Sequence, residues 1–385
     1  MAIAVTGEIP CGSIQILDAN DPGDIRLALR ADAGTHFIGY YHFRVSGARG
    51  VACRFVITNV SEDQRLAGRE QYEDEWTNTG PHASYDLESW FRIPASRTPE
   101  GYVFEHVPEH DVVYYAKWAP YTLEREQRFL ARIGQSPLVH TRVLGSSVRG
   151  YPIECLSLGA GTGSGKPVAW IISRQHPSET MSGFFLEGFL SRLVDSHDTV
   201  ASALRERLDI HVVPNMNPDG VAAGNTRANA VGINLNREWA DPDPHRSPEV
   251  LCVRDEMERL GVDFCLDCHG DEELRCVFLG GPLEIPSRSE QLAGKFREFE
   301  RAWADATPEY EMGHPYPGGA PETADLRMAW NWIGERFKCL SVLLEQPFKD
   351  TSWREDPVTG WSPQRAHALG DRLVEALYAM SGKLR

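Results

Sequence analysis

The sequence predicts an α/β fold in which a β-sheet flanked by helices is preceded by an all-β sandwich domain. The chain has 385 residues, which exceeds what a single hydrophobic core usually organises. Before residue 120, polar and apolar side chains alternate with a period of two, as they do in β-strands. After residue 120, strand-like and helix-like runs alternate, which is the pattern of an α/β domain. We therefore expect two domains, residues 1–120 and residues 121–385.

The expected sandwich consists of short strands whose alternate side chains face a common core. The segments with this pattern are 25–30, 41–45, 51–57, 102–107 and 112–116. Turn-forming residues lie between them, which is typical of a small antiparallel sandwich. A turn at 47–50, Gly-Ala-Arg-Gly, separates the second segment from the third, so we expect these two strands to form a hairpin.

The α/β part is expected to begin with a helix. Thr122 can cap the N-terminus of this helix and Gly134 can end it, and the apolar residues between them lie largely on one side. Further helices are expected at 180–195 and 248–260, between strand-like runs. The residues at 217–220, Asn-Pro-Asp-Gly, are typical of a turn that would shape the loop following it.

Four of the strand-like runs end directly at groups that can bind a metal ion or activate a water molecule. In open α/β sheets, ligands collect at the carboxyl ends of parallel strands, so residues just beyond such runs can converge from distant parts of the sequence. Two histidines and one glutamate form a catalytic zinc set that leaves one position for water. We therefore expect one zinc ion with a further carboxylate beside it. The runs and the groups after them are 168–173 before His176 and Glu179, 210–213 before Asn217, 262–268 before His269, and 340–344 before Glu345.

A longer series of motifs runs through the second domain, namely His176-Pro177-Ser178-Glu179, Asn217-Pro218-Asp219-Gly220, Asn225-Thr226-Arg227, the segment 232–239, Asp267-Cys268-His269-Gly270 and Glu345. This series resembles the zinc carboxypeptidases in order and context. The N-terminal sandwich and the passage 115–121, Tyr-Ala-Lys-Trp-Ala-Pro-Tyr, resemble more narrowly the cytosolic carboxypeptidase subfamily. The resemblance covers most of the chain and implies a zinc carboxypeptidase-like mixed β-sheet. It also implies a zinc metallocarboxypeptidase, which hydrolyses the C-terminal peptide bond of peptides or proteins.

By this resemblance, His176, Glu179 and His269 match the zinc ligands, with one Zn2+ per chain. Glu345 matches the general base, which would take a proton from the water that the metal activates and pass it to the leaving nitrogen. Arg227 matches the arginine that polarises the scissile carbonyl, because a fixed cation can stabilise the developing oxyanion.

The resemblance also implies residues that bind the substrate. Asn236 and Arg237 match the pair that holds the terminal carboxylate, since an arginine fork can grip both of its oxygens. Tyr316 is the candidate for the tyrosine that closes over the substrate, although its spacing to the general base departs from the digestive relatives and Tyr310 is a nearby alternative. Members of the cytosolic subfamily often remove glutamate, which implies a cation in the specificity pocket. Arg327 is the candidate for that cation, and a salt bridge on a helix face is the alternative for this side chain.

Two other motifs have competing interpretations. The segment from Cys265 through Cys268 to His269 has the spacing of covalent haem attachment. We favour the zinc site because such attachment belongs to export compartments and because the motif lies in an apolar strand-like run. The glycine-rich segment 159–166 resembles a phosphate-binding loop, but a strand follows it where such a loop needs a helix, so we expect a surface turn.

Two other functions are compatible with part of the sequence. One is a zinc amidohydrolase that deacylates small N-acyl amino acids, because related zinc folds keep the His-x-x-Glu and Asn-Arg features. The other is a binding module in which the sandwich recruits a partner and the catalytic part is vestigial. The complete sandwich and Arg227 disfavour the first function, and the presence of every presumed catalytic residue disfavours the second.

Composition restricts the partners and the location that we expect. The formal net charge of -16 argues against nucleic-acid binding, which depends on Lys and Arg neutralising phosphates. No uncharged stretch approaches the ~18 apolar residues that a membrane span needs. The first residues show no signal-peptide pattern and the eight cysteines are expected to be buried thiols, so the chain is expected in the cytoplasm. Its expected partner is the C-terminus of a peptide or protein.

Overall fold

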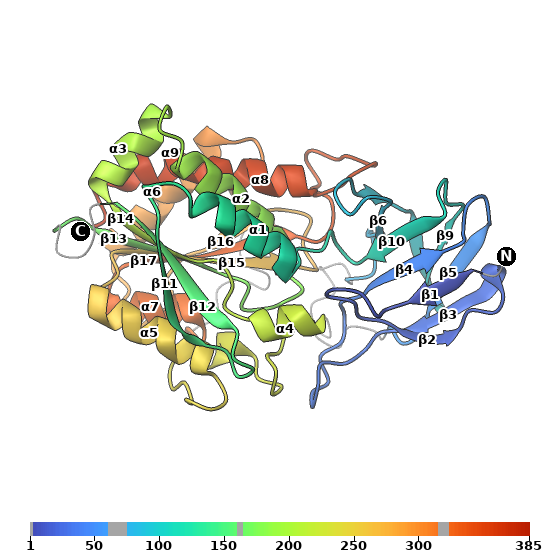
Figure 1. Cartoon of the computed structure of the whole chain (residues 1–385). Coiled ribbons are helices and arrows are strands. Elements are labelled where there is room, and N and C mark those ends of the chain that lie inside the picture. The colour runs from blue at the N-terminus through green and yellow to red at the C-terminus, as the bar shows by residue number, and fades with distance from the viewer. Residues whose placement is uncertain (1–2, 61–74, 160–164, 315–322) are drawn as a thin grey trace.

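The chain has two structurally different parts. The computed structural model describes residues 3–60, 75–159, 165–314 and 323–385. In Figure 1, the strands up to Ala116 gather at one end of the molecule, and a larger sheet with its helices forms the other end. Within the described residues, no helix has both the length and the apolar character needed to cross a bilayer.

Two five-stranded sheets form the N-terminal part of the described chain. The first sheet has the order β1-β4-β10-β6-β7, and the second has the order β2-β3-β5-β9-β8. The strands of the first sheet are β1 (Ala4–Thr6), β4 (His42–Ser46), β10 (Val112–Ala116), β6 (His82–Ser84) and β7 (Phe91–Arg92). Those of the second are β2 (Gln15–Asp18), β3 (Ile25–Ala28), β5 (Cys53–Ile57), β9 (Gly101–His106) and β8 (Ala95–Thr98), with the 3-10 helix η1 (Pro22–Asp24) before β3.

Aromatic side chains from both sheets enclose one hydrophobic core. Phe43 of β4 and Phe55 of β5 are fully buried, and their ring centroids are 5.8 Å apart. Phe55 stacks on Phe104 of β9 at 4.7 Å, and Phe43 lies 5.3 Å from Tyr115 of β10. Because side chains of the two sheets meet face to face, this part is the expected β-sandwich.

The expected hairpin between 41–45 and 51–57 is wrong. β4 pairs with β1 and β10, whereas β5 pairs with β3 and β9 in the other sheet. The turn at 47–50 bonds instead to the segment before β10, where Gly47 N donates to Asp111 O at 2.6 Å. The β3–β5 pair is parallel, so the sandwich is not purely antiparallel. A period of two shows which face a side chain occupies but not which strand lies beside it.

A seven-stranded mixed sheet organises the rest of the described chain. Its order is β11-β12-β14-β13-β15-β17-β16. The central strands β14, β13, β15 and β17 are parallel to one another, and β12 and β16 pair with them antiparallel. The strands are β11 (His140–Ser146), β12 (Pro152–Leu158), β13 (Val168–Ser173), β14 (Asp209–Val213), β15 (Phe264–Asp271), β16 (Phe278–Gly280) and β17 (Leu340–Pro347). This is the predicted α/β fold with a mixed sheet.

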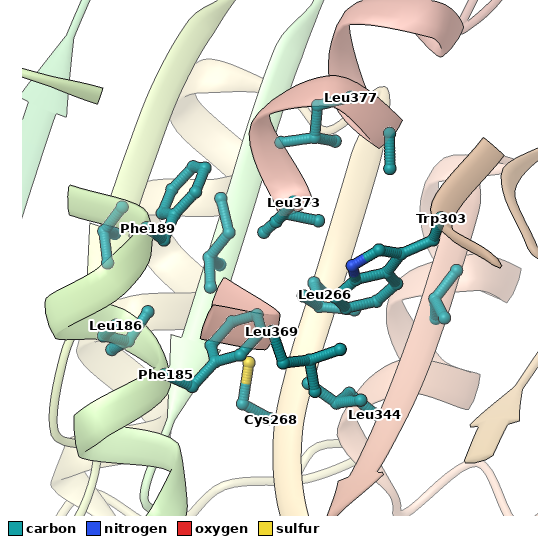
Figure 2. Close-up of a cluster of buried hydrophobic side chains, with 14 of the residues drawn as sticks. Phe185, Leu186, Phe189, Leu266, Cys268, Trp303, Leu344, Leu369, Leu373 and Leu377 are labelled. Atoms are coloured by element: carbon teal, nitrogen blue, oxygen red, sulfur yellow. The ribbon is translucent and has the colours of Figure 1, made fainter. Parts of the chain in front are cut away.

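Helices cover both faces of this sheet (Figure 1). Side chains of α2, α6, α8 and α9 meet those of β15 and β17 in one cluster, shown in Figure 2 around Leu266 and Leu344. α5 and α7 pack on the opposite face. The helices are α1 (Leu123–Ile133), α2 (Met181–Leu193), α3 (Thr199–Arg207), α4 (Pro218–Ala223), the 3-10 helix η3 (Leu235–Arg237), α5 (Pro248–Leu260), α6 (Glu290–Ala306), α7 (Ala329–Phe337), α8 (Pro363–Asp371) and α9 (Leu373–Met380).

Close packing fixes α2, the helix that begins beside the predicted metal ligands. A Cβ atom added to Gly188 of α2 would collide with the carbonyl oxygen of His367 in α8. A Cβ atom on Gly370 of α8 would collide in the same way with the carbonyl oxygen of Phe185. Only glycine permits this approach, so the two helices hold each other at backbone contact.

The sequence indicates several element boundaries correctly and others only in part. β13 and α5 span the expected 168–173 and 248–260, and α1 begins after Thr122, whose Oγ1 accepts from Arg125 N at 3.2 Å. β15 and β17 continue past His269 and Glu345, so these residues lie within strands and not beyond them. The expected turn at 217–220 is the start of α4, because Asn-Pro also suits an N-cap followed by the first helical position.

Candidate active site

The predicted metal ligands and general base lie at the carboxyl edge of the sheet. His176 and Glu179 lie in the connection between β13 and α2. His269 and Glu345 are register partners on the neighbouring parallel strands β15 and β17. The preceding residues Cys268 and Leu344 face the core shown in Figure 2, so His269 and Glu345 project from the opposite face together.

His176, Glu179 and His269 converge on one point. Each offers a donor atom, and these atoms lie within 4.8 Å of one another. Oε1 of Glu179 is 2.6 Å from Nδ1 of His176, and Oε2 is 2.8 Å from Nδ1 of His269. All three side chains are buried. One carboxylate therefore faces two imidazoles, which is the donor chemistry of a catalytic zinc site.

Hydrogen-bond acceptors at the outer nitrogens of both imidazoles also suit a metal site. His269 Nε2 lies 3.0 Å from Oδ1 of the fully buried Asp267, and His176 Nε2 lies 3.1 Å from Oδ1 of Asn234. The amide of Gln175 donates to both oxygens of Asp267 at 2.9 Å. A metal-bound histidine usually donates its other N–H to a carboxylate or carbonyl, which fixes the ring and leaves the first nitrogen for the ion. The residues present therefore fit zinc.

These supporting residues were not predicted from the sequence. Asp267 precedes His269 by two positions in β15, so strand alternation would have placed both on one face. Asn234 and Gln175 gave no such signal, because their contacts depend on the conformation of loops.

Electrostatic shifts in this group reflect burial and mutual contact. Burial lowers the pKa of His176, and the charge of Arg227 lowers it further. Burial raises the pKa of Glu179, but the two imidazoles lower it by more, so the net pKa of Glu179 is lowered. Burial lowers the pKa of His269, but the carboxylates of Asp267 and Glu179 raise it by more, so the net pKa of His269 is raised. A negative charge is therefore stabilised on Glu179, facing both rings.

Glu345 stands half-buried beside the three ligands. Burial raises the pKa of its carboxyl, the nearby charge of His269 lowers it, and Glu179 and Asp271 raise it further, for a net increase. Its Oε2 is shielded from solvent and has no hydrogen-bond partner within the described residues. A buried carboxylate oxygen with unused lone pairs is suited to accept a proton from a molecule bound in front of it.

Arg227 lies in the loop between α4 and η3, close enough to His176 to lower the pKa of that ring. Within the described part of the chain, no side chain pairs with its guanidinium. The site therefore contains a cation that is available to a bound carbonyl or carboxylate oxygen.

Asn236 and Arg237 lie together in η3, next to the start of α7. Asn236 is buried, and its Oδ1 accepts from Ala329 N at 2.8 Å. Arg237 Nη1 donates to Asn236 O at 2.7 Å, and its Nε lies 3.8 Å from Oδ2 of Asp325. Asp325 also binds Arg327 through two bonds, at 2.9 and 2.8 Å. One carboxylate thus holds both predicted arginines, and Arg327 keeps 64% of its side chain exposed.

The two candidate tyrosines are in different situations. Tyr316 lies outside the described residues. Tyr310 is buried in the main core, and its hydroxyl donates to Glu300 of α6 at 2.9 Å. Its ring lies 6.1 Å from that of Trp303, so Tyr310 is a packed core residue.

The competing haem interpretation does not fit the strand. Cys265 and Cys268 belong to hydrophobic clusters on opposite faces of β15, so their thiols cannot both reach one haem. All eight cysteines are free, and all except Cys252 are buried, as expected. The glycine-rich segment 159–166 lies mostly outside the described residues, and β13 begins shortly after it.

Known proteins match both parts of the chain. The cytosolic carboxypeptidase N-terminal domain matches residues 5–118, and the zinc carboxypeptidase domain matches residues 128–331. A metallo-carboxypeptidase from Burkholderia cenocepacia is 39% identical, with a TM-score of 0.91 over 98% of each chain. A metallo-carboxypeptidase from Pseudomonas aeruginosa, solved in complex with (2-guanidinoethylmercapto)succinic acid, is 36% identical, with a TM-score of 0.93 over 99% of this chain and 100% of that one. Cytosolic carboxypeptidase 6 of Mus musculus is 30% identical over 54% of this chain, and the match spans 40% of the mouse protein.

Proposed function

Because the chain belongs to the zinc carboxypeptidase family and is a peptidase, we propose that it removes the C-terminal residue of peptides or proteins, using one zinc ion held by His176, Glu179 and His269. The convergence of these three buried donors supports this proposal most strongly. When bound, zinc acts as a Lewis acid that lowers the pKa of a water molecule and polarises a carbonyl oxygen. Side chains of the protein carry out the other steps.

Glu345 is the proposed general base. Its position beside His269 supports this role, and so does its Oε2, which has no hydrogen-bond partner among the described residues and can accept a proton from the attacking water. The same carboxyl then donates that proton to the leaving nitrogen. The raised pKa of Glu345 favours this proton transfer, because a carboxyl whose pKa lies nearer the working pH can both accept and donate a proton.

Two arginines are proposed to bind the substrate at different oxygens. Arg227, whose guanidinium has no side-chain partner among the described residues, would stabilise the negative charge that develops on the scissile carbonyl. Arg237, with Asn236 beside it, would hold the terminal carboxylate and so restrict cleavage to the end of a chain. Tyr316 is the proposed covering residue, because the core packing of Tyr310 makes it unsuitable.

We propose that glutamate is the preferred C-terminal residue. Arg327, held by Asp325 with most of its side chain exposed, is the proposed cation for its side chain. The net charge of -16 opposes an acidic substrate only at long range, because salt screens exposed charges beyond ~8 Å.

We also propose that the chain divides near residue 120 and that it acts in the cytoplasm. The change from sandwich strands to α1 supports this boundary. The match of residues 5–118 to the N-terminal domain of cytosolic carboxypeptidases and the free, buried cysteines support the location.

The activity can be tested with matched peptides that end in Glu, Lys or Phe, each with a free or an amidated C-terminus. We expect the free peptides to lose one residue, with Glu removed fastest, and the amidated peptides to resist. Glu345→Gln should keep the zinc content of the wild type and lower kcat by about 10²–10⁴-fold, because Gln keeps the shape but cannot accept the proton.

Two results would contradict the proposal. One is full turnover by Glu345→Gln, which would exclude the general base. The other is faster hydrolysis of N-acyl amino acids than of any free peptide, which would identify an amidohydrolase instead.

A further inference from the structure

The N-terminal sandwich contributes one buried carboxylate to the loop that carries Arg227. Asp32, in the segment between β3 and β4, is only 2% exposed. Its Oδ1 accepts from the backbone N of Thr226 at 2.6 Å, and its Oδ2 accepts from the backbone N of Arg227 and of Ala228, both at 2.7 Å. Three consecutive N–H groups therefore converge on one side chain that is more than 190 residues away.

The turn that presents Asp32 is itself fixed by hydrogen bonds. Asp32 N donates to Phe37 O at 2.9 Å, and Asp32 O accepts from Thr35 N at 3.0 Å. A second contact from the same segment reaches the loop, because Tyr40 N donates to Thr226 Oγ1 at 3.1 Å. The sandwich thus forms hydrogen bonds with the Arg227 loop at two places, through Asp32 and through Tyr40.

The same loop is tied to the metal ligands from its other side. Ser178, which directly precedes Glu179, donates through its Oγ to the carbonyl of Thr226 at 2.7 Å. The carbonyl of Thr226 therefore accepts a hydrogen bond from Ser178, and its backbone N–H donates one to Asp32. This arrangement fixes the Cα of Arg227 relative to Glu179 through only two intervening residues.

We propose that Asp32 is a positioning residue for peptide hydrolysis, which holds Arg227 where the oxygen of the scissile carbonyl must lie. The proposal rests on the proposed function, because it assumes that Arg227 acts on that oxygen. The N-terminal domain would then complete the active site.

The chemistry of the contact requires a carboxylate. Three N–H donors need acceptor capacity at both oxygens, and an ionised carboxylate supplies it with charge-assisted bonds. The amide of Asn has one acceptor and one donor end, so Asp32→Asn leaves its NH2 group facing a backbone N–H. The loop must then shift to relieve this clash, and a shift of about 1 Å at a catalytic group can cost about 10²-fold in rate.

Asp32→Asn should therefore lower kcat about 10–100-fold with little change in KM, because the loss concerns the transition state and not substrate affinity. The substrate is the free peptide that the wild type cleaves fastest. Zinc content and thermal unfolding are measured for each variant, so that misfolding is recognised. The matched control is Arg30→Met, which removes another bond from the sandwich, that of Arg30 to Ala223 O, and should keep wild-type kcat.

A double-mutant cycle separates positioning from general structural damage. Arg227→Ala alone should lower kcat about 10²–10³-fold. Adding Asp32→Asn to Arg227→Ala should lower it no further, because Asp32 acts only through that arginine. An equal additional loss in both backgrounds, or wild-type kcat in Asp32→Asn, would overturn the positioning role.

If Asp32→Asn does not fold, Thr226→Val tests the second contact, because it removes only the oxygen that accepts from Tyr40 N. We expect Thr226→Val to lower kcat by the same factor as Asp32→Asn. In the Arg227→Ala background, it should cause no further loss. If Arg227→Ala keeps wild-type kcat, the role of Arg227 in the proposed function fails and the positioning role fails with it. Impaired Arg227→Ala together with fully active Asp32→Asn removes the positioning role alone.

Discussion

At the scale of single residues, second side chains orient several of the candidates for metal and substrate binding. Asp267 fixes the ring of His269, and Asp325 holds both Arg237 and Arg327. Such outer contacts control a metal site because they determine which imidazole nitrogen carries the proton. The chemistry therefore depends on more residues than those that touch the substrate.

Asp267→Asn tests this dependence directly. An amide cannot stabilise the N–H of His269 as a carboxylate does, so we expect zinc affinity to fall about 10–100-fold. The measurement is zinc retention against a competing chelator, with Asp255→Asn on the exposed face of α5 as the control. Equal retention by wild type and Asp267→Asn would show that the contact has no role in metal binding.

Contacts between residues that are close in sequence can be predicted from spacing, whereas contacts between distant residues outside the recognised motifs cannot. His176 and Glu179 share one turn, and Asp267 and His269 share one strand face, so spacing alone brings each pair together. Asp32 meets Thr226 across a separation of 194 residues, and no local pattern indicates that contact. The contact of Asp325 with Arg237 is likewise set by the fold, whereas Arg327 lies only two positions from Asp325.

At the scale of elements, caps and periodicity locate helices and strands but not their neighbours. The Thr122 cap and Gly134 define α1, and apolar runs locate β13 and β17. The wrong hairpin between β4 and β5 arose because both strands bury alternate residues in one core from different sheets. Strand order follows from packing of the whole domain, which lies beyond local sequence.

A buried carboxyl on α1 makes stability depend on pH. Burial raises the pKa of Glu126 from 4.5 to about 7, although Arg174 and the amide of Asn215 act against it. The folded chain thus favours the protonated carboxyl, so this contribution is complete below pH 4.5 and is lost as pH rises through about 7.

Glu126→Gln should remove that loss, because its neutral amide resembles the protonated carboxyl. Relative to wild type, we expect the variant to gain up to about 3 kcal/mol in free energy of unfolding between pH 4.5 and pH 8. Urea unfolding across this range measures the difference. Parallel pH profiles for the two proteins would show that Glu126 does not titrate differently on folding.

At the scale of the whole molecule, the sandwich and the α/β part meet at the candidate site. Trp118, which follows the last sandwich strand, is fully buried, and its indole donates to Trp361 O at 2.8 Å. Thr180, at the start of α2, donates to Ala119 O at 2.8 Å. Together with Asp32, these contacts make the sandwich a structural support of the catalytic edge of the sheet.

The order of motifs along the chain was sufficient to predict the family and the overall fold. It was sufficient because a zinc site at strand ends needs its ligands in fixed elements, so their order persists in the sequence. It did not show how the two domains contact each other, since the residues at their interface form no motif.

Anomalous diffraction at the zinc edge would show whether one zinc ion lies among His176, Glu179 and His269. We expect one strong peak per chain, about 2.0–2.2 Å from Nδ1 of both histidines and from the carboxylate of Glu179. A crystal grown with zinc that shows no peak there, or a full peak at other residues, would exclude this zinc site.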